Sequence, residues 1–303
     1  MTPAVHARGL RRSFGSVLAV DGVDLDVGDH GLFGIVGPDA AGKTTLLRML
    51  VGVLTPDAGS LQILGDDALG PKGRNRLLIG YMSQKFSLYE DLTVAENIAF
   101  FGALRRVPRA DRERRAARVL DATGLAPFTK RYAGNLSGGM KQKLGLVCTL
   151  VHEPRVLFLD EPTNGVDPVS RREFWSILGE LRQRIAVVVA TPSLDEAERC
   201  DRVALMVGGR IQVTDTPRGL RERVVVPVHE VEVESPFPAA EAVEAAFPGV
   251  SVQLFGDRLH VAGEVGPDAL GAALSAAGHP TQVRRISPSL EDAYVQILGG
   301  EAA

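Results

Sequence analysis

One glycine-containing stretch between an apolar strand and a helix limits the fold of this sequence more than any other segment. Residues 37–44 read GPDAAGKT and fit the pattern GxxxxGK[ST]. The apolar run 31–36 predicts a buried strand before it, and an apolar-periodic helix is expected after it, near 44–54. Backbone N–H groups at a helix start lack partners within the helix, and the helix dipole is positive there. The stretch therefore predicts a phosphate-binding loop, with an ordinary glycine-containing turn as the alternative.

Side chains of this loop fit the parts of a bound triphosphate. Lys43 is expected to neutralise the β- and γ-phosphates, Thr44 to bind magnesium through its hydroxyl, and Thr45 to reach the α-phosphate. The complete predicted binding set is Gly37, Pro38, Asp39, Ala40, Ala41, Gly42, Lys43, Thr44 and Thr45.

Two acidic residues follow a second apolar run, VLFLD at 156–160. Open α/β sheets bind their ligands at the carboxyl ends of strands, where this pair is expected. Asp160 would hold magnesium directly or through water, and Glu161 would orient and polarise a water for in-line attack on the γ-phosphate. The alternative is a strand-end turn that an aspartate stabilises.

Strand-like and helix-like segments alternate through much of the chain, which predicts a layered α/β domain. The runs 156–160 and 186–190 are almost wholly apolar, as expected of parallel strands buried on both faces. Residues 1–30 favour short strands joined by turns, and 92–152 favour helices. Capping boxes are expected at three helix starts: Thr93 with Glu96, Ser170 with Glu173, and Ser193 with Glu196.

The character of the sequence changes near residue 220. We predict one domain over 1–220, with a helical subdomain at about 86–152, and a small α+β accessory domain over 221–303. In the second domain the predicted strands are 229–234, 251–255 and 258–262, and the predicted helices are 239–247, 267–277 and 287–298.

Composition excludes several classes of protein. The net charge of −3 gives no general attraction to nucleic acid, and no apolar run approaches the roughly 20 residues that cross a bilayer. We expect no secretory signal, because no apolar run follows the arginines near the start. Two isolated cysteines, Cys148 and Cys200, make no disulfide framework and fit a reducing cytoplasm.

A third motif, LSGGM at 136–140, opens a predicted helix about twenty residues before Asp160. Two adjacent glycines at a helix start cost about 1 kcal/mol each relative to alanine. Their presence is explained if a phosphate must approach the backbone closely. The motif resembles LSGGQ, the signature of ABC transporter ATP-binding subunits. The phosphate-binding loop, LSGGM and LFLDEP follow one another in the order typical of that family, and the resemblance covers about residues 4–220. The remainder resembles the carboxyl-terminal extension of its drug, antibiotic and sodium efflux ATPases.

The resemblance implies a fold and further site residues. The fold would be a P-loop ATPase domain with a RecA-like core, an antiparallel β subdomain and a helical subdomain. Phe14 would stack on adenine, although a core aromatic is the alternative. Gln84 would link magnesium to the transmembrane partner and act with Glu161, and residues 85–92 would line the groove for that partner.

Other matched residues are expected to act across a dimer of ATPase subunits. Ser137, Gly138 and Gly139 would contact the nucleotide bound by the opposite subunit, and Asp167 in the segment 164–168 would communicate between the two subunits.

The function that the resemblance implies is ATP hydrolysis that powers a membrane exporter. Its ligands would be ATP and Mg²⁺, and its partners integral-membrane permease subunits and a second ATPase subunit, with no nucleic acid. The expected location is cytoplasmic, on the inner face of the cell membrane. Alternatives are a regulatory nucleotide-binding module and a non-transport ABC ATPase that acts on ribosomes or DNA.

Besides Met140, two residues depart from the family pattern. Ala40 stands where glycine is usual, and a positive φ there would cost about 1–2 kcal/mol. Pro192 replaces the histidine that contacts the γ-phosphate, and losing such a donor typically costs ~10²–10³ in rate. Either the chain hydrolyses slowly and pairs with a second ATPase that keeps the histidine, as in the amino-terminal half of tandem efflux ATPases, or Thr191 or a water replaces it in an active homodimer.

An arginine-rich stretch, 105–118, is interleaved with acids. It could face lipid headgroups or a nucleic acid, but a solvated helix face is the simpler interpretation.

Overall fold

The computed structural model describes residues 3–69, 77–85, 88–279 and 281–299. It divides the chain into two compact units, Met1–Thr214 and Asp215–Ala303. The boundary expected at 220/221 lies within a short helix, α7 (Pro217–Arg221), which packs against α10 (Leu290–Gly299) of the second unit. Within the described residues, no helix has both the length and the apolar character needed to cross a membrane.

A six-stranded sheet organises the first unit and has the order β10-β9-β3-β8-β7-β6. The pairs from β9 through β6 are parallel. Every residue of β7 and β8 is buried, which explains their almost wholly apolar sequences. The strands are β3 Gly31–Val36, β6 Ile79–Met82, β7 Val156–Asp160, β8 Ala186–Thr191, β9 Arg202–Val207 and β10 Arg210–Asp215.

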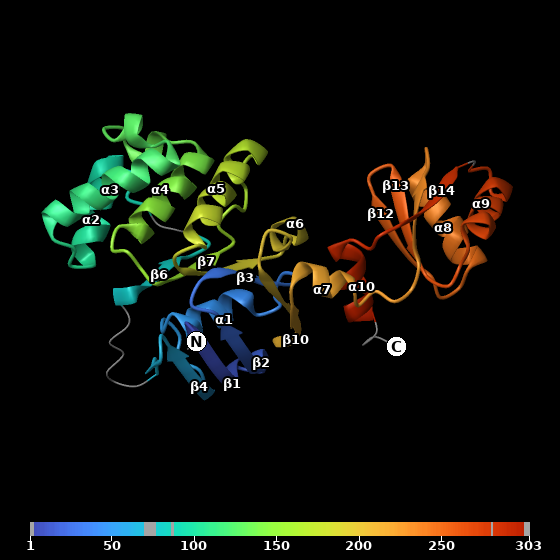
Figure 1. The fold of residues 1–303 in the computed structure, drawn as a ribbon, viewed down its shortest axis with the longest axis horizontal. Helices are drawn as coiled ribbons and strands as arrows, with labels where there is room; N and C mark the ends of the chain where they lie inside the picture. The colour runs from blue at the N-terminus through green and yellow to red at the C-terminus, as the bar shows by residue number, and fades with distance from the viewer. Residues whose placement is uncertain (1–2, 70–76, 86–87, 280, 300–303) are drawn as a thin grey trace. The chain divides into compact units, whose positions relative to one another are not determined.

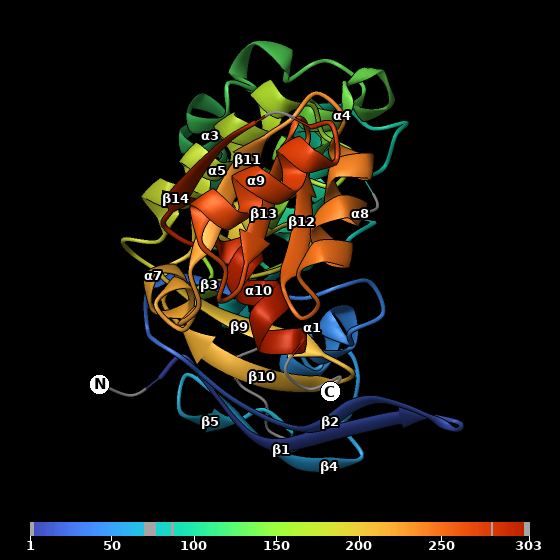
Figure 2. The ribbon, with the colours of Figure 1, turned by 90° about the vertical axis from the view of Figure 1, so that its right-hand side faces the viewer.

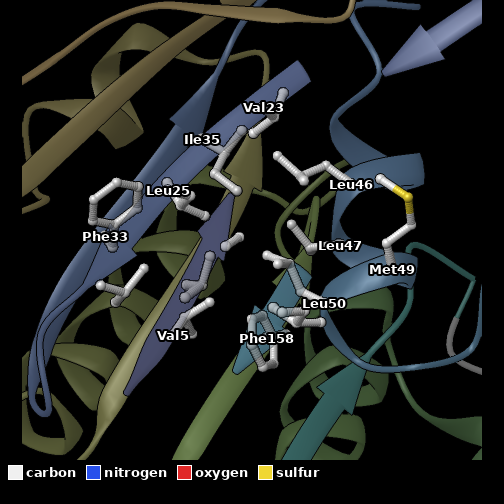
Figure 3. Close-up of a cluster of buried hydrophobic side chains, with 14 of the residues drawn as sticks. Val5, Val23, Leu25, Phe33, Ile35, Leu46, Leu47, Met49, Leu50 and Phe158 are labelled. Atoms are coloured by element: carbon white, nitrogen blue, oxygen red, sulfur yellow. The ribbon is translucent and has the colours of Figure 1, made fainter. Parts of the chain in front are cut away.

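A second, antiparallel sheet of order β2-β1-β4-β5 belongs to the same unit. Helix α1 (Lys43–Leu50) contributes Leu46, Leu47, Met49 and Leu50 to a core shared with both sheets (Figure 3). This packing fixes the start of α1, where the phosphate-binding loop was predicted. The strands are β1 Val5–Phe14, β2 Val17–Val27, β4 Ala58–Ile63 and β5 Asp66–Asp67.

Helices α2 to α5 gather at one side of the first unit (Figure 1). They are α2 Val94–Leu104, α3 Arg109–Thr123, α4 Gly138–Leu150 and α5 Pro168–Leu181, and a short helix α6 spans Leu194–Ala197. A separate apolar core joins α2, α3 and α4. The capping box of Thr93 and Glu96 is confirmed, since both reciprocal hydrogen bonds form at the start of α2.

The other two predicted capping boxes are wrong. The N-cap of α5 is Asp167, which accepts from the N–H groups of Val169 and Ser170, so Ser170 lies inside the helix. Pro168 favours this start, because proline is well suited to the first helical position. At α6, Ser193 occupies the N-cap position but its side chain makes no cap, and Glu196 is drawn instead into a buried network described below.

The second unit has the element order βαββαβ, with a four-stranded antiparallel sheet ordered β12-β13-β11-β14. This is the split-βαβ, ferredoxin-like arrangement. Helices α8 and α9 share one apolar core with the sheet (Figure 2). The elements are β11 Val228–Glu232, α8 Pro236–Ala246, β12 Ser251–Phe255, β13 Arg258–Ala262, α9 Pro267–Ala276 and β14 Gln282–Ile286. Strand β14 was not predicted, because its sequence QVRRI is mostly polar.

Candidate active site

The predicted phosphate-binding loop connects β3 to α1, and its first and last glycines are required by close packing. A Cβ atom on Gly37 would lie 1.9 Å from the carbonyl oxygen of Met206 in β9. A Cβ atom on Gly42, whose φ is 101°, would lie 2.2 Å from the carbonyl oxygen of Ala19 in β2. Both sheets therefore hold the loop, and no larger side chain fits at either position.

Ala40, at the tip of the loop, has a φ of 62°. This is the positive φ that was expected to cause strain, because the left-handed backbone conformation favours glycine over a residue with a Cβ atom.

Lys43 is buried, and its Nζ donates to the carbonyl oxygens of Gly37 and Pro38, at 2.8 Å each. Burial lowers the pKa of Lys43, while the nearby carboxylates of Glu161, Asp39 and Asp160 oppose that shift. An ammonium group has three donors, so one is left for a phosphate oxygen. The two carbonyl contacts hold that donor at the loop.

Asp160 and Thr44 meet at the carboxyl end of β7. The Thr44 hydroxyl donates to Oδ1 of Asp160 at 2.9 Å, and Oδ2 is buried with no hydrogen-bond partner among the described residues. Burial raises the pKa of Asp160. A hard divalent cation prefers oxygen ligands of this kind, and it would satisfy the orphaned carboxylate oxygen. The residues present therefore fit Mg²⁺.

Glu161 is held by two amides. Nε2 of Gln84 and Nδ2 of Asn164 each donate to its Oε2 at 2.9 Å, and the backbone N–H of Glu161 donates to Ala190 of β8 at 2.8 Å. Glu161 has a φ of 46°, a strained conformation for a residue with a Cβ atom. Within the described residues, no hydrogen bond to the other carboxylate oxygen, Oε1, is formed, so that atom can accept from a water.

Lys43, Thr44 and Glu161 line one hollow. Its volume is about 160 Å³, and it is lined by Ala19, by the loop from Asp39 to Thr45 and by Glu161. Asp160 and Gln84 are not among the lining residues, but they hydrogen-bond to Thr44 and Glu161, which are. The structure thus brings the phosphate-binding loop, the acidic pair and Gln84 together from three segments far apart in the sequence.

Phe14 ends β1 and does not line that hollow. Its side chain is 49% exposed, which excludes the alternative of a core aromatic. The guanidinium of Arg12 lies over the ring, 5.1 Å from its centroid. The outer face of the ring can take a planar base, so stacking on adenine stays a prediction.

Ser137, Gly138, Gly139 and Asp167 form a second group, outside the hollow. The Ser137 hydroxyl caps α4 by accepting from the N–H of Met140 at 3.3 Å. A Cβ atom on Gly139 would lie 2.4 Å from the side chain of Ser170, so packing explains this glycine. A Cβ atom on Gly138 would have nothing within 4 Å, so no contact within the described chain requires that glycine.

A buried network that the sequence did not reveal lies behind Pro192. Glu196 accepts hydrogen bonds from the hydroxyls of Thr163 and Thr191, the second at 2.6 Å. The Thr191 hydroxyl in turn accepts from the N–H of Ser193 at 3.0 Å. Pro192 itself is exposed at the end of β8. The spacing of Ser193 and Glu196 predicts a helix cap, but the Glu196 side chain instead accepts from two buried hydroxyls, which the sequence alone does not indicate.

Asn164 was also missed as an individual site residue. It stood inside the matched segment 164–168, three positions after Glu161, where a turn returns its side chain to the carboxylate.

Comparison with known proteins places this geometry in a family. A family model described as "ABC transporter" matches residues 20–164. The Nod factor export ATP-binding protein I of Rhizobium sp. (strain N33) is 32% identical over 98% of this chain and 98% of its own length. The chain belongs to the ABC transporter ATP-binding proteins.

Further relatives support the assignment of this ABC ATPase. The probable multidrug ABC transporter ATP-binding protein YbhF of Escherichia coli (strain K12) is 42% identical over 93% of the chain, which spans about half (49%) of that relative. The structure of cbiO1 from Clostridium perfringens, part of the ABC transporter complex cbiONQ, matches with a TM-score of 0.67 at 26% identity over 73% of this chain and 91% of that one. The predicted fold class is confirmed, and nucleotide binding follows from the family.

Proposed function

We propose that this ABC ATPase binds ATP with Mg²⁺ and hydrolyses it to power export through an integral-membrane permease. The carrying observation is the shared hollow, in which Lys43 and the start of α1 lie beside a restrained Glu161. In this proposal the phosphates accept from the free donor of Lys43 and from the N–H groups of α1. Asp160 and Thr44 hold Mg²⁺, which neutralises phosphate charge when it is bound.

The hydrolytic step depends on the orientation of Glu161. Two amides hold its Oε2, which leaves Oε1 to accept a hydrogen bond from the attacking water and turn its oxygen toward the γ-phosphate. The position of this carboxylate requires a positive φ at Glu161. Backbone strain of this kind is common at active sites.

We further propose that two ATPase subunits complete each site. Ser137 and Gly138 lie outside the hollow, and Gly138 leaves an open surface at the start of α4. A phosphate held by the opposite subunit could approach the N–H groups there without meeting a side chain. The second subunit is either another copy of this chain or a related ATPase.

Cross-linking between chains tests this arrangement. Asp39→Cys and Ser137→Cys are made in separate copies that also carry Glu161→Gln, so that bound ATP persists. The native Cys148 and Cys200 are buried and give little background. We expect an oxidant to join the two chains only when ATP and Mg²⁺ are present. If ATP adds no cross-link either in the isolated chain or in its membrane complex, the shared site is wrong.

An exposed aromatic cluster supports permease binding in this proposal. Tyr89 and Phe100 are 45% and 41% exposed, and their ring centroids lie 4.7 Å apart, next to Phe101. Tyr89 belongs to the segment 85–92, which is expected to line the permease groove, whereas Phe100 and Phe101 lie in α2. Residues 86 and 87 of that segment lie outside the described residues. Contact with a permease would place the chain on the inner face of the cell membrane.

The test of export is co-purification followed by transport. We expect the chain to co-purify with a permease, and Tyr89→Ala combined with Phe100→Ala to release it while soluble ATP binding is retained. Co-purification with ribosomes or DNA instead would favour the non-transport alternative.

A second candidate function, a slowly hydrolysing half of a heterodimer, is favoured by Pro192. Proline has neither a side-chain donor nor a backbone N–H. Thr191 cannot replace the family's histidine without breaking its hydrogen bond to Glu196, because its single proton is already donated there. Only a water then remains as a substitute within the homodimer.

Turnover of the isolated chain separates the two candidates. Under the heterodimer proposal, Pro192→His raises kcat by roughly tenfold or more, whereas Pro192→Ala does not. Rapid turnover by the unmodified chain, unchanged in Pro192→His, would leave the homodimeric motor as the function.

A further inference from the structure

A second hollow of the first unit lies at the amino ends of the parallel strands, whereas the candidate active site lies at their carboxyl ends. Its volume is about 460 Å³, and it lies between α3, the end of α4, α5 and the segments that enter β7 and β8. Arg155 comes just before β7 and Ile185 just before β8, whereas Asp160 and Thr191 end those strands. The two hollows are therefore separated by the length of the strands.

The wall of this hollow is apolar over much of its area. The apolar lining comes from Val119, Ala122, Leu150, Ile177, Leu181 and Ile185. The volume lies within the range of about 300–1,000 Å³ that is typical of small-molecule sites. An apolar hollow of this size favours a ligand with a hydrocarbon part.

Charged groups also line this hollow. Four arginines, Arg115, Arg118, Arg155 and Arg184, and two acids, Glu153 and Glu180, line the hollow, so four positive and two negative charges leave a formal charge of +2. Glu153 pairs with Arg115 at 3.0 Å. Across the part of the chain that the structure describes, the guanidinium groups of Arg118, Arg155 and Arg184 form no ion pair.

Other arginines of the same helix behave differently. Arg109 pairs with Glu113 at 2.8 Å, and Arg114 pairs with Asp111 at 2.6 Å, both on the exposed surface of α3. These pairs are the solvated helix face expected for the arginine-rich stretch. Arg115 and Arg118 instead line the hollow, and Nε of Arg115 is buried with no hydrogen-bond partner among the described residues.

The backbone beside this arginine is also strained. Glu153, which pairs with Arg115, has a φ of 53°. A residue with a side chain is unfavourable in this conformation, and the position follows α4, where glycine is the usual choice. The side chain of Glu153 provides the counter-charge for Arg115, which glycine could not do.

We propose that this hollow binds a phosphate monoester that carries a hydrocarbon chain. Guanidinium groups match phosphate oxygens in geometry and charge, and the formal charge of +2 matches a phosphate monoester dianion. The hydrocarbon chain packs on the apolar wall. A membrane lipid with a phosphate-monoester headgroup and a soluble alkyl phosphate share this chemistry.

Calorimetric titration of the full chain with dihexanoyl phosphatidic acid and with hexyl phosphate tests the site. We expect Arg118→Gln combined with Arg184→Gln to weaken binding by about tenfold or more, as the loss of charge-assisted hydrogen bonds implies. Arg109→Gln combined with Arg114→Gln removes the same charge from neighbouring exposed positions and should leave binding unchanged. Ala122→Trp, which fills the hollow without changing its charge, should also abolish binding.

Two arms distinguish the sources of the ligand. If the chain floats with vesicles of phosphatidylcholine that contain phosphatidic acid, and the Arg118 and Arg184 variant does not, the ligand is a lipid. If the chain binds hexyl phosphate in the titration but does not float with the vesicles, the ligand is soluble. Absence of binding to both probes overturns the proposal. So does equal weakening in the Arg109 and Arg114 variant, or inorganic phosphate binding as tightly as hexyl phosphate.

Discussion

The side-chain amide of Gln84 donates a 2.9 Å hydrogen bond to Oε2 of Glu161, although 77 positions separate the two residues in the sequence. Gln84 follows β6 and Glu161 follows β7, and these strands are parallel neighbours in the sheet. Their carboxyl ends are therefore adjacent, and a shift of the chain after β6 would remove one of the two amides that hold the carboxylate. A permease that moved the segment after Gln84 would thus act directly on the candidate catalytic group.

Substitution of Glu161 by glutamine should separate chemistry from binding. The amide keeps the size of the carboxylate but cannot accept a proton, so we expect turnover to fall by roughly 10²–10³ while ATP affinity changes little. Phosphate release and equilibrium nucleotide binding measure the two effects. Glu113→Gln, on the exposed surface of α3, is the matched control; equal losses in both variants would contradict the assigned role.

The two glycines that begin α4 should respond differently to alanine. Gly138→Ala meets no atom within 4 Å, so the unfolding free energy should be unchanged or slightly higher, while turnover falls because a methyl group obstructs the approaching phosphate. Gly139→Ala meets the side chain of Ser170 at 2.4 Å and should lower the unfolding free energy by about 1–3 kcal/mol. Thermal unfolding and phosphate release measure both. Full activity in Gly138→Ala would show that nothing approaches this surface.

Replacement of Ala40 by glycine should relieve strain in the phosphate-binding loop. Because Ala40 has a φ of 62°, we expect Ala40→Gly to tighten ATP binding several-fold, in line with a penalty of about 1–2 kcal/mol. Ala40→Val, with a branched side chain, should weaken it. Titration with a fluorescent ATP analogue measures the affinity of each chain. Equal affinities for the unmodified chain and both variants would refute the argument.

His152 should make the first unit less stable in mild acid. Burial lowers its pKa to about 4, although a hydrogen bond to the carbonyl oxygen of Ile79 opposes the shift. Between pH 4 and about 6.5 the unfolded chain binds more protons than the folded one, so the unfolding free energy rises with pH by up to ~1.4 kcal/mol per unit. This stability is present above pH 6.5 and is lost as the pH falls toward 4.

The measurement is the Tm of the full chain and of His152→Gln between pH 4.5 and 7.5. Glutamine can still donate to Ile79 but does not titrate, so its Tm should fall less steeply on acidification. Parallel curves for the two chains would assign the acid sensitivity to other groups.

Local sequence predicted most of the first unit. The apolar runs of β7 and β8 leave little choice but buried parallel strands, and the glycines at 37 and 42 mark the loop, because only glycine fits both the turn and the packing. The acidic pair after β7 then lies at the edge where parallel strands end.

Long-range contacts were harder to predict. Nothing in the sequence around Asn164 indicates that its amide reaches Glu161, since this depends on the turn between them. Asp167 displaced Ser170 as the cap of α5 because Pro168 fixes the first helical position, and a rule based on spacing alone does not weigh that preference. Strand β14 lies at the edge of its sheet and carries two arginines, so no apolar alternation revealed it.

Lys43 lines the hollow whereas Ser137 of the same chain lies outside it, and this arrangement has a genetic consequence. If each working site takes Lys43 from one subunit and Ser137 from the other, a chain damaged at the first residue and a chain damaged at the second can complement each other. Their mixed pair has one site with both residues intact and one with neither, so two inactive alleles together regain partial activity.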